Sequence, residues 1–97
     1  MLQLILDDSA KVLLDEHFEE SQKIEYLRVY MRPHGYTQAH ALALRPDFKE
    51  DRDLEFSSNG YSFLLNNHLA ELLGGWVKIK ASSKGCFDVI SEKNITV

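Results

Sequence analysis

The stretch MRPHGYTQAH, from Met31 to His40, carries side chains that could bind a metal ion. Its two histidines, His34 and His40, flank Tyr36 and Thr37, and imidazole is a ligand that iron and zinc both accept. The histidines are 6 residues apart with no carboxylate between them. This spacing favours a solvated loop residue at His34 and a partly buried strand residue at His40 over a metal site.

The single cysteine, Cys86, could be a nucleophilic or redox-active thiol. A thiol becomes reactive beside a cation, and Lys84 is close in sequence. Cys86 opens the apolar run CFDVI, however, and a lone cysteine within a strand is usually a small buried hydrophobe. We therefore expect it to be inert. One cysteine also excludes a disulfide framework and any cluster or zinc site built from several thiolates of one chain.

The sequence gives no support for catalysis. It has no Ser, His and acid arrangement at a defensible spacing, no Gly-rich phosphate loop after a strand, and no acid pair with a reason to have split pKa values. His17 falls on the apolar stripe of a predicted helix and is expected at the edge of the core. His68, near the start of another predicted helix, is expected to be exposed. We predict no enzyme activity, no catalytic residue, no metal site and no cofactor.

Size and charge limit the fold and the partners. The 97 residues fit one domain, residues 1–97, and the 44% hydrophobic and 27% charged residues are typical of a folded protein. Eleven basic against fifteen acidic residues give a net charge of −4 and no basic stripe, which argues against nucleic acid and against an acidic membrane surface. MLQLILDDSA has no basic flank, so it is neither a signal peptide nor a spanning helix. We expect a cytoplasmic protein.

The elements that would position these residues follow from periodicity. Residues 2–6 read as a strand, and residues 7–21 as a helix that Asp7 or Asp8 caps and Ser21 and Gln22 end. Residues 24–32 alternate as a half-buried strand that Pro33 closes, and residues 39–45 alternate as a second strand. The stretch of His34 to Gln38 is then the connection between neighbouring strands.

The second half predicts a hairpin, a helix and two more strands. A charged loop at residues 46–53 leads to strand-like segments on either side of Asn59-Gly60, a dipeptide suited to a tight turn. Residues 66–75 predict a short helix capped by Asn66 or Asn67 and stopped by Gly74 or Gly75. Its expected buried stripe consists of Leu69, Leu72 and Leu73. Residues 76–80 and 86–90 predict strands, with a fraying tail after them. The order β-α-β-β-β-β-α-β-β is typical of an α+β domain.

This order, together with particular residues, resembles the A-type iron–sulfur carriers, the IscA/HesB family. The family reads LRVxVxxGGCSG where this chain has LRVYMRPHGYTQ, from Leu27 to Gln38. The acidic DFKEDRD, the Asn-Gly hairpin, LAELLGGWVKI and CFDVISEKN follow in the family's order, so the resemblance spans nearly the whole chain. It implies an IscA/HesB-like β-sandwich of mostly antiparallel strands with two helices.

The departures from the family lie at its ligands. The family holds iron or a cluster with one cysteine in the GCSG loop and two in a terminal CGCG, because iron–sulfur clusters need thiolates. Here Tyr36 stands at the loop position, the terminal pair is absent, and Cys86 falls where the family has a glycine. The resemblance thus implies a degenerate member that lacks the cluster cysteines. A smaller set of members shares this loss, which implies regulation or assembly rather than cluster transfer.

Aromatic and basic residues share one face of the strand at residues 24–32. Tyr26, Arg28 and Tyr30 alternate with the apolar residues, and Arg32 and Tyr36 follow. A surface rich in Tyr and Arg is typical of protein-binding hot spots. Tyr26 and Tyr30 covering a second core layer is an equally good interpretation.

Three hypotheses follow. The leading one is a cluster-free protein, a monomer or weak dimer, that contacts protein partners of sulfur or iron–sulfur metabolism. Its expected partner-binding residues are Arg32, His34, Tyr36, Thr37 and Gln38. The second is an iron or cluster carrier with substituted ligands, namely His34, His40 and Cys86. The third is a redox sensor that uses Cys86 alone.

Overall fold

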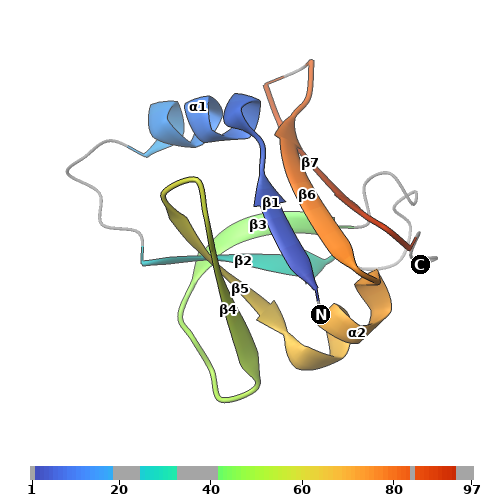
Figure 1. The fold of residues 1–97 in the computed structure, drawn as a ribbon. Coiled ribbons are helices and arrows are strands. Elements are labelled where there is room, and N and C mark those ends of the chain that lie inside the picture. The colour runs from blue at the N-terminus through green and yellow to red at the C-terminus, as the bar shows by residue number, and fades with distance from the viewer. Residues whose placement is uncertain (1, 19–24, 33–41, 84, 94–97) are drawn as a thin grey trace.

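The computed structural model describes residues 2–18, 25–32, 42–83 and 85–93. Within these residues, two helices and seven strands follow one another in the predicted order, which makes the fold α+β (Figure 1). The strands are β1 (Gln3–Leu6), β2 (Tyr26–Met31), β3 (Leu42–Asp47), β4 (Asp53–Ser58), β5 (Tyr61–Asn66), β6 (Trp76–Ala81) and β7 (Phe87–Ser91). The helices are α1 (Asp8–His17) and α2 (Asn67–Leu73).

Helix α1 begins where the sequence places a cap and ends earlier than expected. The Asp7 carboxylate accepts the Ser9 N–H at 3.1 Å, which confirms Asp7 as the N-cap. The helix ends at His17, because Phe18 takes an extended backbone conformation and packs against the core. The predicted end at Ser21 and Gln22 was therefore wrong, and those two residues lie outside the described residues.

Strand β3 extends into the segment that the sequence assigned to a charged loop. It includes Pro46 and Asp47, with Pro46 opposite Leu27 of β2. The loop prediction for residues 46–53 was wrong at both ends, since Asp53 already belongs to β4. Pro46 is tolerated because β3 is an outer strand of its sheet, where one edge forms no ladder hydrogen bonds.

The β4–β5 hairpin confirms the strongest local prediction. Asn59 and Gly60 form its turn with φ of 50° and 86°, the positive values that a tight two-residue hairpin turn requires. The ladder runs from Ser58 opposite Tyr61 to Asp53 opposite Asn66.

Helix α2 confirms its predicted ends but not its predicted buried stripe. The Asn66 side chain accepts the His68 N–H at 2.9 Å, and Gly74 follows the last helical residue with φ 91°. Ala70 and Leu73 are buried, whereas the side chain of Leu72 is 55% exposed. Leu72 was wrongly placed in the core because a seven-residue helix contacts the rest of the molecule along one narrow side.

The strands form two sheets, and each sheet is mixed. One has the order β1-β6-β7 and the other β3-β2-β5-β4. β1 pairs with β6 in parallel and β2 with β5 in parallel, while the other three pairings are antiparallel. The expectation of mostly antiparallel strands is confirmed in part, because three of the five pairings are antiparallel and each sheet also holds one parallel pair. β1 and β6 are joined by a long connection through the other sheet. β2 and β5 are neighbours because β3 and β4, which lie between them in the sequence, occupy the two outer positions of the same sheet.

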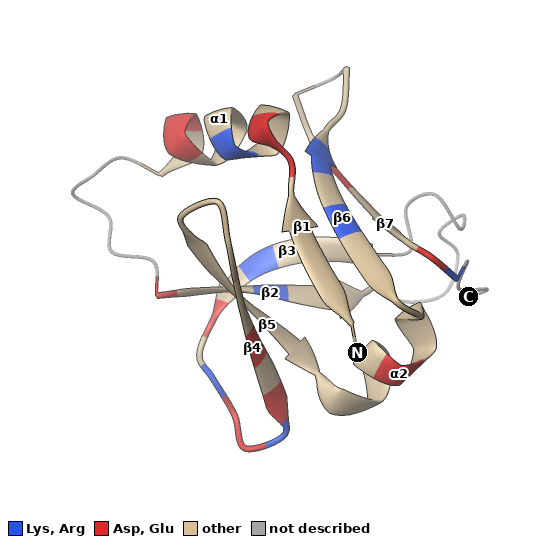
Figure 2. Cartoon of the chain, viewed as in Figure 1, with Lys and Arg blue, Asp and Glu red and all other residues tan. Residues whose placement is uncertain are grey.

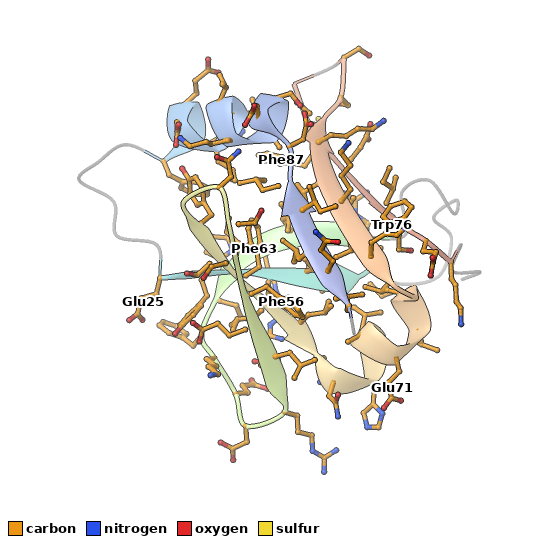
Figure 3. All side chains as sticks on the ribbon, in the orientation of Figure 1. Glu25, Phe56, Phe63, Glu71, Trp76 and Phe87 are labelled. Carbon is orange, nitrogen blue, oxygen red and sulfur yellow. The ribbon has the colours of Figure 1, made fainter. Side chains whose placement is uncertain are left out.

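Both sheets and both helices contribute to one hydrophobic core. The inward residues of β2, Leu27 and Val29, meet Phe63 and Leu65 of β5, Val77 and Ile79 of β6, and Leu14 of α1. Phe63 is fully buried in the middle of these side chains (Figure 3). This core fixes which face of β2 points outward, and so decides where Tyr26, Arg28 and Tyr30 lie.

Candidate functional site

The outer face of the four-stranded sheet carries a buried ion cluster centred on Arg28. Its Nη1 donates to Asp53 Oδ1 at 2.6 Å and its Nη2 donates to the other oxygen of the same carboxylate. Its Nε donates to Asp47 Oδ2 at 2.6 Å, and Nη2 also donates to the Phe48 carbonyl at 3.2 Å. Arg28 and Asp53 are each only 8% exposed. One guanidinium thus joins β2, β3 and β4.

The electrostatics keep the cluster ionised. The hydrogen bonds from Arg28 lower the pKa of Asp53, and burial opposes them without cancelling their effect. The Phe48 N–H, followed by Arg28, lowers the pKa of Asp47. The carboxylates in turn raise the pKa of Arg28, with the hydrogen bonds to Asp53 first. The three groups are therefore charged at neutral pH and held in a fixed geometry.

This cluster holds the Phe48 loop, residues 48–52, which joins β3 to β4. Asp47 Oδ1 accepts the Phe48 N–H at 2.8 Å, and Asp53 Oδ2 accepts the Glu50 N–H at 2.7 Å. Figure 2 shows charges of both signs along this loop. The Phe48 side chain is nevertheless 80% exposed. The hydrogen bonds fix the conformation of the loop, so the exposed ring is suited to insertion into an apolar pocket of a partner protein. We missed this residue in the sequence, where it stands within a charged run.

The two tyrosines of β2 lie on the same outer face, each half-buried. The Tyr26 hydroxyl donates to Glu55 of β4 at 3.2 Å, and the Arg45 guanidinium lies 4.8 Å from the centre of the Tyr30 ring. The side chains of Tyr26 and Arg28 thus reach from β2 to β4 across β5, on either side of Leu64. Leu64 faces outward but is fully buried, so these long side chains cover it.

The structure therefore divides the predicted Tyr/Arg face into two parts. Arg28 is a buried structural ion rather than a binding residue. Tyr26 and Tyr30 are half-buried on the outer face instead of covering a core layer between the two sheets, and a role for them in partner binding stays a prediction. No signal in the sequence pairs Arg28 with Asp53, because the two residues lie 25 positions apart.

Of the predicted partner-binding residues, the structure describes only Arg32. Arg32 follows β2 and is half-buried. His34, Tyr36, Thr37, Gln38 and His40 lie outside the described residues. β2 and β3 pair antiparallel up to Met31 opposite Leu42, which confirms that this stretch connects two neighbouring strands. β3, into which the loop leads, contacts β7, the last strand.

Cys86 lies in the turn before β7 and is exposed. The expectation of a buried strand cysteine was wrong, because the β6–β7 ladder stops at Ala81 opposite Phe87. Beyond that pair, the Ser82 N–H donates to the Cys86 carbonyl at 2.7 Å and the Cys86 N–H donates to the Ser82 hydroxyl at 3.2 Å. Gly85, with φ 73°, allows the tight turn.

Two of the histidines are described. His17 is exposed in the last turn of α1 and contacts the rings of Phe18 and Phe87 edge-on, so it lies farther out than the expected core edge. His68 is exposed, as expected, and lines an open depression of about 340 Å³ with Arg52 and Asn67. Among the described residues no group of three His, Cys, Asp or Glu side chains is placed to hold a metal ion.

A comparison with solved structures shows which known fold this architecture resembles. No protein-family model and no curated protein matches the sequence. A solved structure of IscA with the [2Fe-2S] cluster matches 93% of this chain and 86% of its own chain, with a TM-score of 0.61 and 18% sequence identity. The chain has an IscA-like fold. In the described residues, no helix has the length and apolarity needed to span a bilayer.

The IscA-like fold raises the question of whether this chain fits a cluster. Iron–sulfur clusters are held by several thiolates. This chain has one cysteine, and it lies at the exposed β6–β7 turn. A thiolate-held cluster within one chain therefore does not fit these residues.

Proposed function

We propose that this chain is a cluster-free, non-catalytic IscA-like protein that acts through protein contacts. Its role would be regulation or assembly in bacterial sulfur oxidation or iron–sulfur metabolism. The observation that carries the proposal is the combination of an IscA-like fold with a single cysteine. An architecture that holds a [2Fe-2S] cluster in one solved protein here lacks the thiolates for it.

The proposed contact surface is the loop from Arg32 to Gln38, with His34, Tyr36 and Thr37 between them. Its sequence resemblance supports this choice, since Tyr36 stands where the carriers have a cysteine. Arg and Tyr are also enriched in binding hot spots. The exposed Phe48, in the loop after β3, would be a second and separate contact point, because it lies at the opposite end of the β2–β3 pair from Met31 and Leu42.

The biological setting proposed for the chain rests on the cysteine-free subgroup of the family. That subgroup includes DsrR, a protein associated with dissimilatory sulfite reductase genes, and we propose a kinship with it. The partners would be proteins of sulfur or iron–sulfur metabolism in the cytoplasm, without nucleic acid or membrane contact. The chain would act as a monomer or weak dimer.

A second candidate function is an iron or cluster carrier with the substituted ligands His34, His40 and Cys86. The exposed position of Cys86 favours it, because an accessible thiol can join a site shared between two chains. The two functions differ in what happens when iron and sulfide are offered.

Anaerobic reconstitution with ferrous iron and sulfide decides between them. The cluster-free protein should remain colourless after desalting, without the visible charge-transfer absorption of a cluster. A stable brown product with stoichiometric iron would contradict the proposal. A triple variant with Cys86→Ala, His34→Ala and His40→Ala is the matched control: its failure to bind iron that the unaltered protein binds would establish the substituted-ligand carrier.

A further inference from the structure

A slot runs between the outer edge of β1 and the outer edge of β4. Each is an outermost strand of its sheet. The two strands contact each other although they belong to different sheets. The slot has a volume of about 570 Å³ and is lined by uncharged residues: Leu2, Gln3, Leu4, Ile5, Phe56, Ser57 and Ser58. Figure 3 shows Phe56 on the side of β4 that faces β1.

The backbone of β1 presents hydrogen-bonding groups to this slot. The Gln3 N–H donates to the Gly75 carbonyl, and the Asp7 N–H to the Ile79 carbonyl, each at 2.9 Å. In a parallel ladder, every second residue of a strand bonds to the same neighbouring strand. Because Gln3 and Asp7 bond to the β6 side, the backbone groups of Gln3, Ile5 and Asp7 face β6. Leu4 and Leu6 turn their N–H and C=O groups to the opposite edge, toward β4.

One end of the slot is already closed by the β4–β5 turn. The Leu6 N–H donates to the Ser58 hydroxyl at 3.0 Å, and the Asn59 amide donates to the Leu6 carbonyl at 3.3 Å. Both edge groups of Leu6 are therefore satisfied by side chains. The edge groups of Leu4, two residues earlier, have no hydrogen-bond partner among the described residues.

The opposite wall is a strand edge as well. The Asn67 N–H donates to the Arg52 carbonyl at 3.0 Å, and bonded pairs alternate along an antiparallel ladder. Asp53, Glu55 and Ser57 therefore direct their backbone groups away from β5. Of these three residues only Ser57 lines the slot. The backbone groups of Ser57 therefore face a chain that enters the slot.

We infer that the slot takes an extended, uncharged segment of a partner protein, which adds to the β1-β6-β7 sheet as a strand beside Leu4. Unsatisfied edge groups select an extended chain, because only an extended backbone presents its N–H and C=O groups at matching intervals. The uncharged lining selects a segment without Asp, Glu, Lys or Arg, since a charge would lose its hydration there without gaining a partner.

The walls also argue against a second copy of this chain as the occupant. An edge strand of another copy would bring its own neighbour with it, β6 beside β1 or β5 beside β4. β4 lies against the free edge of β1, so the second strand of such a sheet margin would meet it. This inference does not depend on whether the protein carries a cluster.

The test uses a fluorescent, end-capped peptide of about six alternating valines and threonines, the length of an ordinary strand. The full protein should bind it saturably in fluorescence anisotropy, and a peptide with glutamates in place of the valines should not bind. Ser57→Pro removes an N–H that points into the slot and should weaken binding about tenfold or more. Glu55→Pro makes the same change on the same edge outside the slot, and should bind within about twofold of the unaltered protein.

Amide hydrogen exchange of the unaltered protein gives a second readout that needs no variant. The peptide should slow exchange at Leu4 and Ser57 and leave the free edge of β3 unchanged. Absence of saturable binding, or equal weakening by the two proline variants, would overturn the inference. Protection at β3 or β7 instead of β1 would overturn it as well.

Discussion

Arg28 and Asp53 form a buried, bidentate ion pair that crosses β5 and links β2 to β4. The pair lies outside the hydrophobic core, on the outer face of the sheet. It sets the conformation of the loop that presents Phe48, because the same two side chains also bond to the Phe48 carbonyl and the Glu50 N–H. A structural ion pair thus fixes the loop that presents Phe48, at the end of the β2–β3 pair opposite to Met31 and Leu42.

Removing one partner of this pair should destabilise the protein strongly. Asp53→Asn leaves the Arg28 charge without its buried counterion, and we expect a loss of about 3 kcal/mol in the free energy of unfolding, measured in urea. The double variant Arg28→Met with Asp53→Leu should recover part of that loss, because it buries no charge. A double variant that is no more stable than Asp53→Asn would show that the pair does more than balance charge.

The ion pair should also make stability depend on acid. The pKa of Asp53 is lowered in the fold from its usual 3.8, so its contribution is complete above that value and is lost as the pH falls through the lower folded pKa. The stability advantage of the unaltered protein over Arg28→Met should therefore shrink below about pH 4. Urea unfolding of both proteins from about pH 7 to about pH 3 measures it. An advantage that persists undiminished in acid would contradict this account of Asp53.

Gly74→Ala should cost more stability than Gly60→Ala, although both glycines have positive φ. A Cβ at Gly74 would lie 2.6 Å from Glu92 Oε1 and 3.1 Å from Glu92 Cβ, whereas a Cβ at Gly60 meets nothing within 4 Å. Gly74→Ala would also disturb the Gly75 N–H to Glu92 hydrogen bond of 2.7 Å. We expect losses of about 2 kcal/mol and about 1 kcal/mol, respectively, by thermal unfolding. Equal losses would mean that Glu92 moves aside freely.

Phe48→Ala should leave folding intact and weaken partner binding. The exposed ring contributes little to the core, so we expect a change within about 0.5 kcal/mol in the free energy of unfolding. Phe63→Ala is the contrast, because truncating a fully buried phenylalanine costs about 3 kcal/mol or more. Tyr36→Ala is the companion variant in the predicted contact loop. Titration calorimetry with a purified partner protein then measures affinity, and unaltered binding by both variants would contradict the proposed contact surface.

Several parts of this fold follow from neighbouring residues alone. Asp7 caps α1, Asn59-Gly60 turns the β4–β5 hairpin, and Gly74 ends α2. In each case the determining interaction spans only a few positions, so it can be read from the printed order of residues. The whole-chain resemblance predicted the IscA-like fold that the comparison of structures supports.

The candidate site was less predictable, because its contacts join distant segments. The exposure of Cys86 depends on where the β6–β7 ladder stops, and the burial of Ala70 instead of Leu72 depends on how α2 lies against β5. The residues of the predicted contact loop, His34 to Gln38, lie outside the described residues, so their role stays a prediction.

The sequence by itself determined the chemistry available to this protein: one thiol and a net negative charge. Only the tertiary structure shows that Arg28 is a buried residue that links β2 to β3 and β4, instead of a contact residue. Only the tertiary structure also shows the slot between β1 and β4. The physical reason is separation along the chain. Arg28 and Asp53 lie 25 positions apart and Leu6 and Ser58 lie 52 apart, and only the packing of two mixed sheets on one core brings such pairs together.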